Sequence, residues 1–249
     1  MRTLVIGDIH GCSFALDRLL QAVAPSGDDR IITLGDYVDR GPDSKGVLDR
    51  LIALHRTGML VALLGNHEEM MLDAAESPDK LRCGMWRGCG GNQTLASYGI
   101  VRGLPSDFKA IPEEHWRFLR ESCVDWYETA THLFAHANVD PEVEMAKQSR
   151  TILRWEKLLE ARPHCSGKTL LCGHTRQVDG WPLNLGCVVC IDTGAYATNG
   201  WLTCLEVETG RFVQANQHGE LRESDLTTLP APGSDELGPR DPEAVNWLE

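Results

Sequence analysis

Three glycine-flanked segments near the start of the chain carry side chains of the kinds that hold divalent metal ions. They are Gly7–Gly11 (GDIHG), Gly35–Gly41 (GDYVDRG) and Gly65–Glu68 (GNHE), and each follows an apolar run typical of a buried strand. Two later histidines, His136 and His174, also follow strand-like runs. Because five strand ends all deliver metal-type ligands, packing alone does not explain the pattern. We expect a two-metal site suited to the hydrolysis of phosphate esters.

The ligand assignment follows from the reach of each donor. Asp8 and His10 are two residues apart at a strand end, so both side chains turn to one side. Asp36 stands in the matching place after the second strand, and its two oxygens are able to bridge two ions. The expected set is one ion held by Asp8, His10 and Asp36 and a second ion held by Asp36, Asn66, His136 and His174. Oxygen and nitrogen donors without a thiolate favour Mn²⁺, with Fe or Zn²⁺ as alternatives.

Further side chains in these segments suit the reaction itself. A water held between two ions about 3.5–4 Å apart becomes hydroxide near neutral pH and attacks phosphorus. We expect His67 to protonate the leaving group, and Asp39 to orient that imidazole and raise its pKa. Arg40 is expected to bind phosphate oxygens through its planar guanidinium, with Asn66 also facing the substrate.

As a set, these motifs resemble the calcineurin-type metallophosphoesterases, and among them the phosphoprotein phosphatase family. Two later segments, Ala135–Ala137 and Cys172–Thr175, resemble the two remaining histidine motifs of that family, in the same order. The resemblance runs from about Leu4 to Gly194. It implies a four-layer α/β/β/α sandwich with a di-metal centre at its rim. The compact length resembles the bacterial and phage serine/threonine protein phosphatases.

The chain departs from the family pattern at two places. Family members often carry arginine just before the GNH motif, where this chain has Leu64. They also tend to place an arginine after a Leu-Trp pair downstream of the first late histidine. Here the stretch is LRWEK, so the resemblance assigns that phosphate-binding role to Arg154, with Lys157 as the alternative.

The first third of the chain alternates strands and helices in a way that positions these motifs. We expect strands at 3–6, 31–34 and 59–64, with helices over 13–23, 44–54 and 68–75. Such β-α-β units pair their strands in parallel, and ligands gather beyond the carboxyl ends of those strands. The three early motifs all stand at these ends.

The rest of the chain is richer in strands. A helix is predicted over 113–122, a hairpin from 124–129 with 132–135, and a helix over 151–161. Short strands follow at 169–172, 188–192, 202–207 and 211–213. The expected architecture is therefore an α/β first half and a β-rich second half in one domain, with two mixed sheets packed between helices.

A glycine-rich segment, 83–98, interrupts this pattern. Its GCGG run at Gly88–Gly91 lacks the spacing and the preceding strand of a dinucleotide-binding fingerprint. It either lines the substrate groove or simply turns the chain.

We expect a catalytic domain over 1–222 and a flexible tail over 223–249. The tail has four prolines and seven acidic residues against a single basic residue, Arg240. So polar a segment does not bury enough apolar surface to fold alone.

Composition limits the partners. The net charge of −12 repels nucleic acid and anionic membranes. No apolar stretch approaches membrane-spanning length, and we expect Met1–Leu4 to lead into a strand rather than to begin a signal peptide. Nine scattered cysteines favour reduced thiols, so we expect a cytoplasmic protein. The oligomeric state is not indicated.

The leading function is a serine/threonine protein phosphatase acting on phosphoproteins or small phosphorylated substrates. A symmetrical diadenosine tetraphosphate hydrolase is the alternative, because such enzymes look similar and share the metal set. Asp39 and Glu68 favour the phosphatase, because those hydrolases tend to lack the first and to carry Asp in place of the second. A non-catalytic scaffold is disfavoured because every ligand and the acid are retained.

Overall fold

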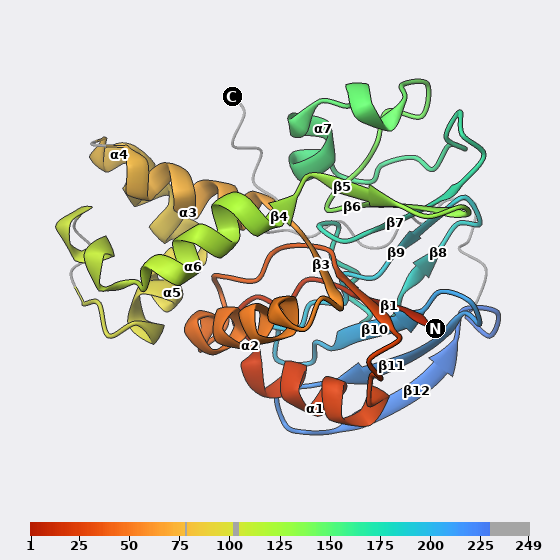
Figure 1. Cartoon of the computed structure of the whole chain (residues 1–249), viewed down its shortest axis with the longest axis horizontal. Helices are drawn as coiled ribbons and strands as arrows, with labels where there is room; N and C mark the ends of the chain where they lie inside the picture. Colours follow the sequence, from red (N-terminus) through yellow and green to blue (C-terminus); the bar gives the residue numbers. More distant parts are fainter. Residues whose placement is uncertain (78, 102–104, 230–249) are drawn as a thin grey trace.

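Two β-sheets packed against each other form the centre of the molecule. The computed structural model describes residues 1–77, 79–101 and 105–229. Helices cover the outer face of each sheet, and Figure 1 shows the resulting layers. The expected four-layer α/β/β/α sandwich is confirmed.

The larger sheet has seven strands and holds the first three motifs. Its order is β12 (Leu221–Asp225), β11 (Arg211–Ala215), β10 (Leu202–Glu206), β1 (Thr3–Ile6), β2 (Arg30–Thr33), β3 (Leu60–Leu63) and β4 (Cys123–Val124). Strands β1 to β4 are parallel, as predicted for β1, β2 and β3, while β10, β11 and β12 run antiparallel to their neighbours. The loops after β1, β2 and β3 therefore meet at one edge.

The smaller sheet has five strands. Its order is β5 (Trp126–Glu128), β6 (His132–Ala135), β7 (Thr169–Cys172), β9 (Val188–Cys190) and β8 (Leu183–Asn184). The three central strands, β6, β7 and β9, are parallel, and the two edge strands run antiparallel to them. The two late histidine motifs follow β6 and β7, so they also leave their sheet at one edge.

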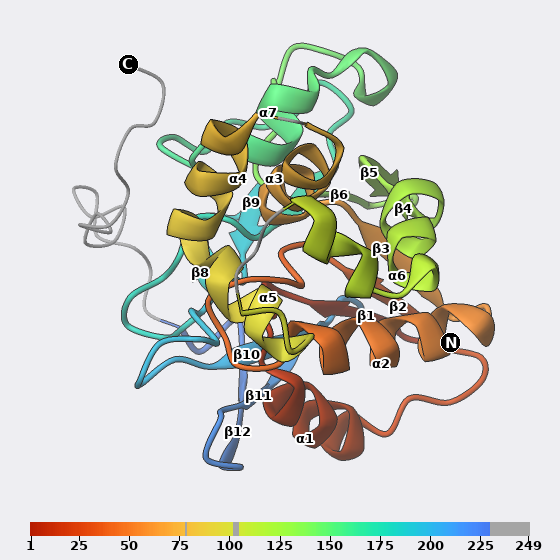
Figure 2. The ribbon, with the colours of Figure 1, turned by 90° about the vertical axis from the view of Figure 1, so that its left-hand side faces the viewer.

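The helices fall into three groups. In the first, α1 (Ser13–Val23) and α2 (Ser44–Arg56) share an apolar core with the larger sheet. In the second, α7 (Arg150–Trp155) packs on the smaller sheet. The third group comprises α3 (Asn66–Glu76), α4 (Lys80–Trp86), α5 (Asn92–Ser97) and α6 (Glu113–Arg117). Arg87–Gly91 joins α4 to α5 through a kink at Gly90, and a π-helical turn at Phe118–Ser122 follows α6. Figure 1 shows this helical cluster at one end of the sandwich, on the left, and in Figure 2 the same cluster faces the viewer.

The alternation of side chains along β1 explains how one strand serves two layers. Leu4 and Ile6 belong to the core shared with α1 and α2, whereas Val5 belongs to the core between the sheets. Successive side chains of a strand point to opposite faces, so a strand that is apolar throughout is buried on both sides. Phe134 and Leu171 of the smaller sheet complete the core between the sheets.

The predicted hairpin strand at 124–129 proves to be divided between the two sheets. Val124 pairs with Leu63 in the larger sheet, and Trp126 pairs with Ala135 in the smaller one. The chain crosses from one sheet to the other at Asp125. A continuous apolar run does not reveal such a crossing, because both halves are equally suited to a strand.

The predicted helix over 151–161 is shorter than expected, since α7 ends at Trp155. The following residues are bound to the loop after β7 instead. The Nζ atom of Lys157 donates to the carbonyl of His174 at 2.7 Å, and the N–H of Leu158 donates to Oγ1 of Thr175 at 2.9 Å. These bonds hold the chain extended where helix propensity alone would continue the helix.

The predicted tail begins inside a strand. Glu223 lies in β12, which pairs with β11 over five residues, so the sheet extends beyond the expected boundary at 222. Residues 230–249 of that predicted tail lie outside the described residues. Across the described ranges, no helix has the length and apolar character needed to span a bilayer.

Candidate metal centre

Six candidate ligands converge from both sheets. The loops after β1, β2 and β3 supply Asp8, His10, Asp36 and Asn66, and the loops after β6 and β7 supply His136 and His174. Their atoms come close across large sequence separations. An oxygen of Asp36 lies 3.4 Å from Nε2 of His10, and its other oxygen lies 3.3 Å from Nε2 of His136. Asn66 Oδ1 is 2.9 Å from the same Nε2 of His136.

Asp36 belongs to two donor groups. His10, Asp36 and His67 offer ligand atoms within 4.8 Å of one another, and so do Asp36, His136 and His174. The shared carboxylate is the one that the sequence predicts to bridge two ions. Burial by itself raises the pKa of Asp36, but the surrounding imidazoles, His136 foremost, lower the pKa below its ordinary value and favour the carboxylate.

Backbone carbonyls fix the orientation of the three imidazoles among the candidate ligands. Nδ1 of His10 is 2.9 Å from the carbonyl of Val38, and Nδ1 of His136 is 2.8 Å from that of Leu34. Nε2 of His174 is 2.9 Å from the carbonyl of Trp155. A carbonyl only accepts, so each of these nitrogens carries the proton and the opposite nitrogen keeps its lone pair. Metal-binding histidines are oriented in this way.

The surroundings of Asp8 fit a bound cation. Its Oδ1 atom is buried and has no hydrogen-bond partner among the described residues, while Oδ2 accepts the N–H of His174 at 3.0 Å. A Cβ atom at Gly173 would lie 1.9 Å from Oδ1, so glycine leaves the space that this carboxylate needs. Burial, followed by the charges of Asp192 and Asp36, raises the pKa of Asp8. A buried carboxylate among others is stabilised by a cation, and this mixed donor set suits a divalent metal.

Several site residues adopt left-handed backbone conformations that are uncommon outside glycine. The φ angles are 45° at His10, 51° at Asp36, 72° at Asp39, 65° at Arg40 and 61° at His174. Such conformations cost energy and persist only where the surroundings enforce them, as at functional sites.

Glu68 enforces the conformation of the loop after β2. This buried carboxylate accepts four backbone N–H groups: those of Gly65, Asp36, Tyr37 and Val38, at 2.7 to 3.1 Å. The sequence indicates Glu68 only as a family marker. The structure gives it a physical role, which is to fasten the loop that carries Asp36 to the start of α3.

His67 and Asp39 form a buried pair beside the ligands. Nδ1 of His67 is 2.7 Å from Oδ2 of Asp39, and Nε2 of His67 is 3.9 Å from an oxygen of Asp36. Burial lowers the pKa of His67, but the carboxylates of Asp36 and Asp39 outweigh it and raise the pKa above its ordinary value. The imidazole is therefore suited to carry a proton that it can donate.

Arg40 is exposed, and it shares a partner, Tyr196, with Arg176; the sequence did not single out either of these two residues. Its Nη1 donates to the hydroxyl of Tyr196 at 2.7 Å, and Nη1 of Arg176 donates to the same oxygen at 3.0 Å. The Tyr196 ring also lies 5.0 Å from that of His10, centroid to centroid. Tyr196 lies shortly after β9, beyond the polar segment Asp192-Thr193-Gly194. That segment is a sixth strand end with polar residues, and this pattern could have indicated from the sequence that the loop reaches the site.

Arg154, which the resemblance assigns to phosphate binding, is instead engaged by carboxylates of the protein. It pairs with Asp125 through Nη2 and with Glu69 through Nη1 at 3.3 Å, and its side chain is buried. It makes no hydrogen bond or ion pair to the six candidate ligands. Lys157, the alternative residue for phosphate binding, lies nearer to the candidate ligands, because its Nζ atom donates to the carbonyl of His174.

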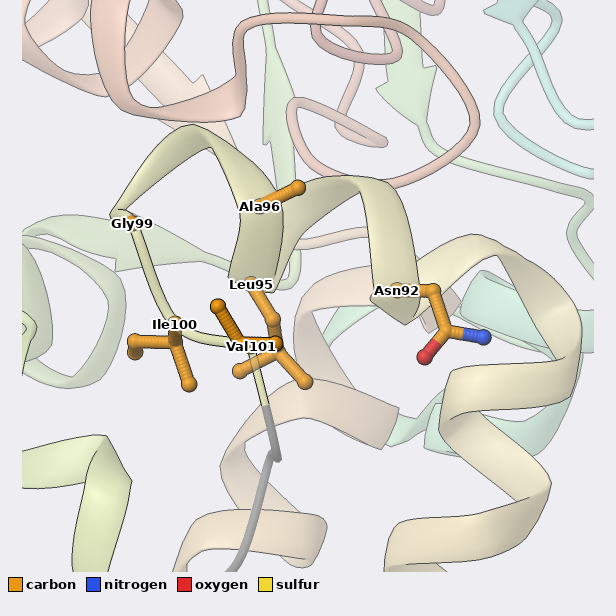
Figure 3. A pocket seen from close by; sticks show the side chains of 6 residues that line it. All are labelled: Asn92, Leu95, Ala96, Gly99, Ile100 and Val101. Atoms are coloured by element: carbon orange, nitrogen blue, oxygen red, sulfur yellow. The ribbon is translucent and has the colours of Figure 1, made fainter.

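A separate pocket of about 350 Å³ lies along α5 and the turn after it (Figure 3). It is lined by Asn92, Leu95, Ala96, Gly99, Ile100 and Val101. None of the candidate ligands lines it, so it is distinct from the metal centre. The metal centre itself opens to solvent at Arg40, Arg176 and Tyr196, which are exposed or half-buried.

Comparisons with known proteins agree with this geometry. Residues 1–176 match the family model described as calcineurin-like phosphoesterase. Over 225 residues the chain is 32% identical to serine/threonine-protein phosphatase 1 of Salmonella typhimurium. The matched region covers 82% of this chain and 91% of that protein. It is 36% identical over 137 residues to the symmetrical bis(5'-nucleosyl)-tetraphosphatase of Ralstonia nicotianae, covering 55% of this chain and 42% of that protein.

A solved structure supports the fold. A protein serine/threonine phosphatase from Saccharomyces cerevisiae superposes with a TM-score of 0.57 at 15% identity, covering 93% of this chain and 81% of that one. Identity at this level bears on the architecture alone.

Proposed function

We propose that this chain, which belongs to the calcineurin-like phosphoesterase family, hydrolyses phosphoserine and phosphothreonine esters in proteins. The observation that carries the proposal is the position of Asp36, which belongs to both donor groups and has the buried His67–Asp39 pair beside it. A shared carboxylate between two donor groups, next to a proton donor, is an arrangement that can hold two ions and assist phosphate ester hydrolysis.

The residues divide into those that hold metal and those that act on the substrate. One ion would be held by Asp8, His10 and Asp36, and the other by Asp36, Asn66, His136 and His174. When bound, two such ions, for which we favour Mn²⁺, neutralise phosphate oxygens and lower the pKa of a water. The presence of Asp36 in one donor group with His10 and in another with His136 and His174 supports this division.

His67 supplies the proton for the leaving oxygen. Its Nδ1–H is held by Asp39, so the opposite nitrogen faces the site and can donate. Arg40 binds the phosphate with its guanidinium, which the Tyr196 hydroxyl holds in place. Arg176 shares that hydroxyl and adds a second positive charge at the same opening. Arg154 is not assigned to phosphate binding, because the carboxylates of Glu69 and Asp125 already engage it.

The extent of the similarities supports a protein phosphatase over the alternative. The chain covers 91% of the Salmonella phosphatase but 42% of the Ralstonia tetraphosphatase. Asp39 and Glu68, which favour the phosphatase in sequence, both have structural roles here. The second candidate, hydrolysis of dinucleoside polyphosphates, is favoured by the two guanidiniums that meet at Tyr196, since a chain of phosphates offers each of them a partner.

A substrate panel separates the two candidates. The purified chain, loaded with Mn²⁺, is assayed on phosphoserine, phosphothreonine and phosphotyrosine peptides and on diadenosine tetraphosphate. We expect the highest kcat/KM on a phosphoserine or phosphothreonine peptide. A much higher value on the dinucleotide would reverse the ranking, and the absence of both bound metal and turnover would favour a non-catalytic scaffold. Repeating the panel with Fe and with Zn²⁺ in place of Mn²⁺ tests which metal supports the highest activity.

A further inference from the structure

The carboxylate of Asp39 is held by more than His67. The indole N–H of Trp86 donates to both of its oxygens, at 2.9 and 3.1 Å, and the hydroxyl of Thr94 donates to Oδ1 at 2.7 Å. All of these side chains are buried. Trp86 ends α4 and Thr94 lies in α5, so both belong to the helical cluster and not to the two sheets that carry the candidate ligands.

Thr94 also holds the backbone of Asp39. Its Oγ1 accepts the N–H of Asp39 at 2.8 Å, and Ser44 Oγ lies 3.1 Å from the same N–H. The two hydroxyls are 2.9 Å apart. A single threonine thus fixes both the position of residue 39 and the direction of its side chain.

The glycine-rich run between Trp86 and Thr94 makes this approach possible. The carbonyl of Gly90 accepts the N–H of Arg40 at 3.2 Å, and a Cβ atom on Gly90 would lie 2.6 Å from that nitrogen. A Cβ atom on Gly91 would lie 2.6 Å from the Trp86 ring. The run therefore does more than turn the chain. It lets the segment from Trp86 to Thr94 close over Asp39 and Arg40.

We propose that Trp86 and Thr94 are positioning residues for the proposed phosphoester hydrolysis, acting on His67 through Asp39. The Trp86 N–H and the Thr94 hydroxyl fix the carboxylate, and the carboxylate fixes the Nδ1–H of His67. The Nε2–H proton of His67 passes to the departing oxygen as its bond to phosphorus breaks, and the imidazole is left neutral. A carboxylate that loses one of its donors can rotate, and the proton then no longer points at the leaving oxygen.

The effect is specific to leaving groups that need the proton. Phenolate is a poor leaving group and requires protonation, whereas p-nitrophenolate departs without it. A loosened His67 therefore slows hydrolysis of phenyl phosphate much more than hydrolysis of p-nitrophenyl phosphate. General damage to the fold or the metal centre slows both esters together.

The test uses three variants of the full chain with Mn²⁺. Trp86→Phe removes the N–H and keeps an aromatic ring. Thr94→Val removes the hydroxyl at similar volume, and Thr94→Ser keeps it. We expect the first two variants to lower kcat on phenyl phosphate about 10- to 100-fold, with a change of no more than about threefold on p-nitrophenyl phosphate. KM and metal content are expected to stay unchanged, and Thr94→Ser to stay near wild type.

Trp116→Phe is the matched control. Trp116 is buried in the same helical cluster, with its ring 6.2 Å from Phe108 and its face covered by Arg120, and it is not bonded to Asp39. This variant should leave both rates unchanged. If Trp86→Phe does not fold, the comparison of Thr94→Val with Thr94→Ser still tests whether the donor to Asp39 positions His67.

The outcomes separate the two proposals. Equal losses on both esters, loss of metal, or a Thr94→Ser variant as impaired as Thr94→Val would overturn the positioning role alone. A wild-type chain that binds Mn²⁺ but hydrolyses neither ester would overturn the proposed function itself, and the positioning role with it.

Discussion

Nδ1 of His67 lies 2.7 Å from Oδ2 of Asp39, and both side chains are buried. The contact joins the start of α3 to the loop after β2, residues that are 28 apart in the chain. A carboxylate only accepts here, so the imidazole carries hydrogen on Nδ1, and its other nitrogen is turned toward Asp36. This geometry supports the proposal that His67 acts as a proton donor beside the candidate ligands, although it also belongs to a donor group with His10 and Asp36.

Replacing His67 by Asn tests that distinction. Metal content after loading with Mn²⁺ should stay at the wild-type value, because the assigned ligands are untouched. The kcat on a phosphoserine peptide should fall about 10²- to 10⁴-fold, the usual contribution of general acid catalysis, and less on p-nitrophenyl phosphate. Since His67 also lies in the donor group with His10 and Asp36, loss of one ion in His67→Asn would show that it is a ligand.

Glu68→Gln tests how the loop after β2 is held. The amide group of glutamine would place its own N–H groups against backbone donors, so at least one of the four N–H groups loses its acceptor. Urea denaturation should show a free energy of unfolding lower by about 1–3 kcal/mol, and Mn²⁺ should bind more weakly. Glu76→Gln, at an exposed position of the same helix, is the control. Equal stability of the two variants would remove this role from Glu68.

The sequence predicts some parts of this molecule well. In these parts a local pattern of residues is compatible with a single arrangement of strands and helices. Apolar runs followed by glycine and a metal-type ligand identify β1, β2 and β3, and the helices between them require parallel pairing. The same pattern predicts that Asp36 and His136 meet, although 100 residues separate them, and they lie 3.3 Å apart. The two residues follow strands of different sheets, so this prediction rests on their shared character as metal ligands and not on pairing within one sheet.

What the sequence does not show depends on contacts between distant segments. No local pattern tells that Trp86 reaches Asp39, because the indole could as well be an ordinary core residue. The Arg154 guanidinium is another case, since its partner Asp125 sits where the chain changes sheets, and that crossing has no signature. The length of α7 was overestimated because tertiary bonds from Lys157 override helix propensity.

Tyr196→Phe tests whether the shared hydroxyl organises the phosphate-binding guanidiniums. The change keeps the ring under Arg40 but removes the oxygen that Arg40 and Arg176 both contact. Steady-state kinetics on a phosphoserine peptide should show KM raised about fivefold, which corresponds to one hydrogen bond of about 1 kcal/mol, with metal content unchanged. Unaltered kinetics would show that the guanidiniums are held without this hydroxyl.

Asp29→Asn tests an electrostatic contribution to stability far from the metal centre. Hydrogen bonds from the Arg2 guanidinium, then from the N–H of Ser26, hold the pKa of Asp29 well below its usual range. The stabilisation is therefore fully present above the unfolded-state pKa of about 3.9 and is lost as the pH falls toward the folded-state pKa.

At pH 7 the Asp29→Asn variant should have a free energy of unfolding about 1–3 kcal/mol below that of wild type, and the gap should narrow below about pH 4. Urea denaturation across this pH range measures it. Asp28→Asn, at the exposed neighbouring position, should match wild type throughout. If the difference in free energy of unfolding between wild type and Asp29→Asn were the same at acid and neutral pH, the destabilisation would come from altered packing and not from the lost charge.

Metal stoichiometry of wild type and Asp36→Asn is the most direct test of a centre built around one shared carboxylate. Both proteins are loaded with Mn²⁺, freed of excess metal and measured by elemental analysis, with folding checked by circular dichroism. Wild type is expected to hold two ions per chain, and folded Asp36→Asn less than one, because Asp36 alone belongs to both donor groups. A wild-type chain that binds no metal, or a variant that keeps both ions, would contradict it.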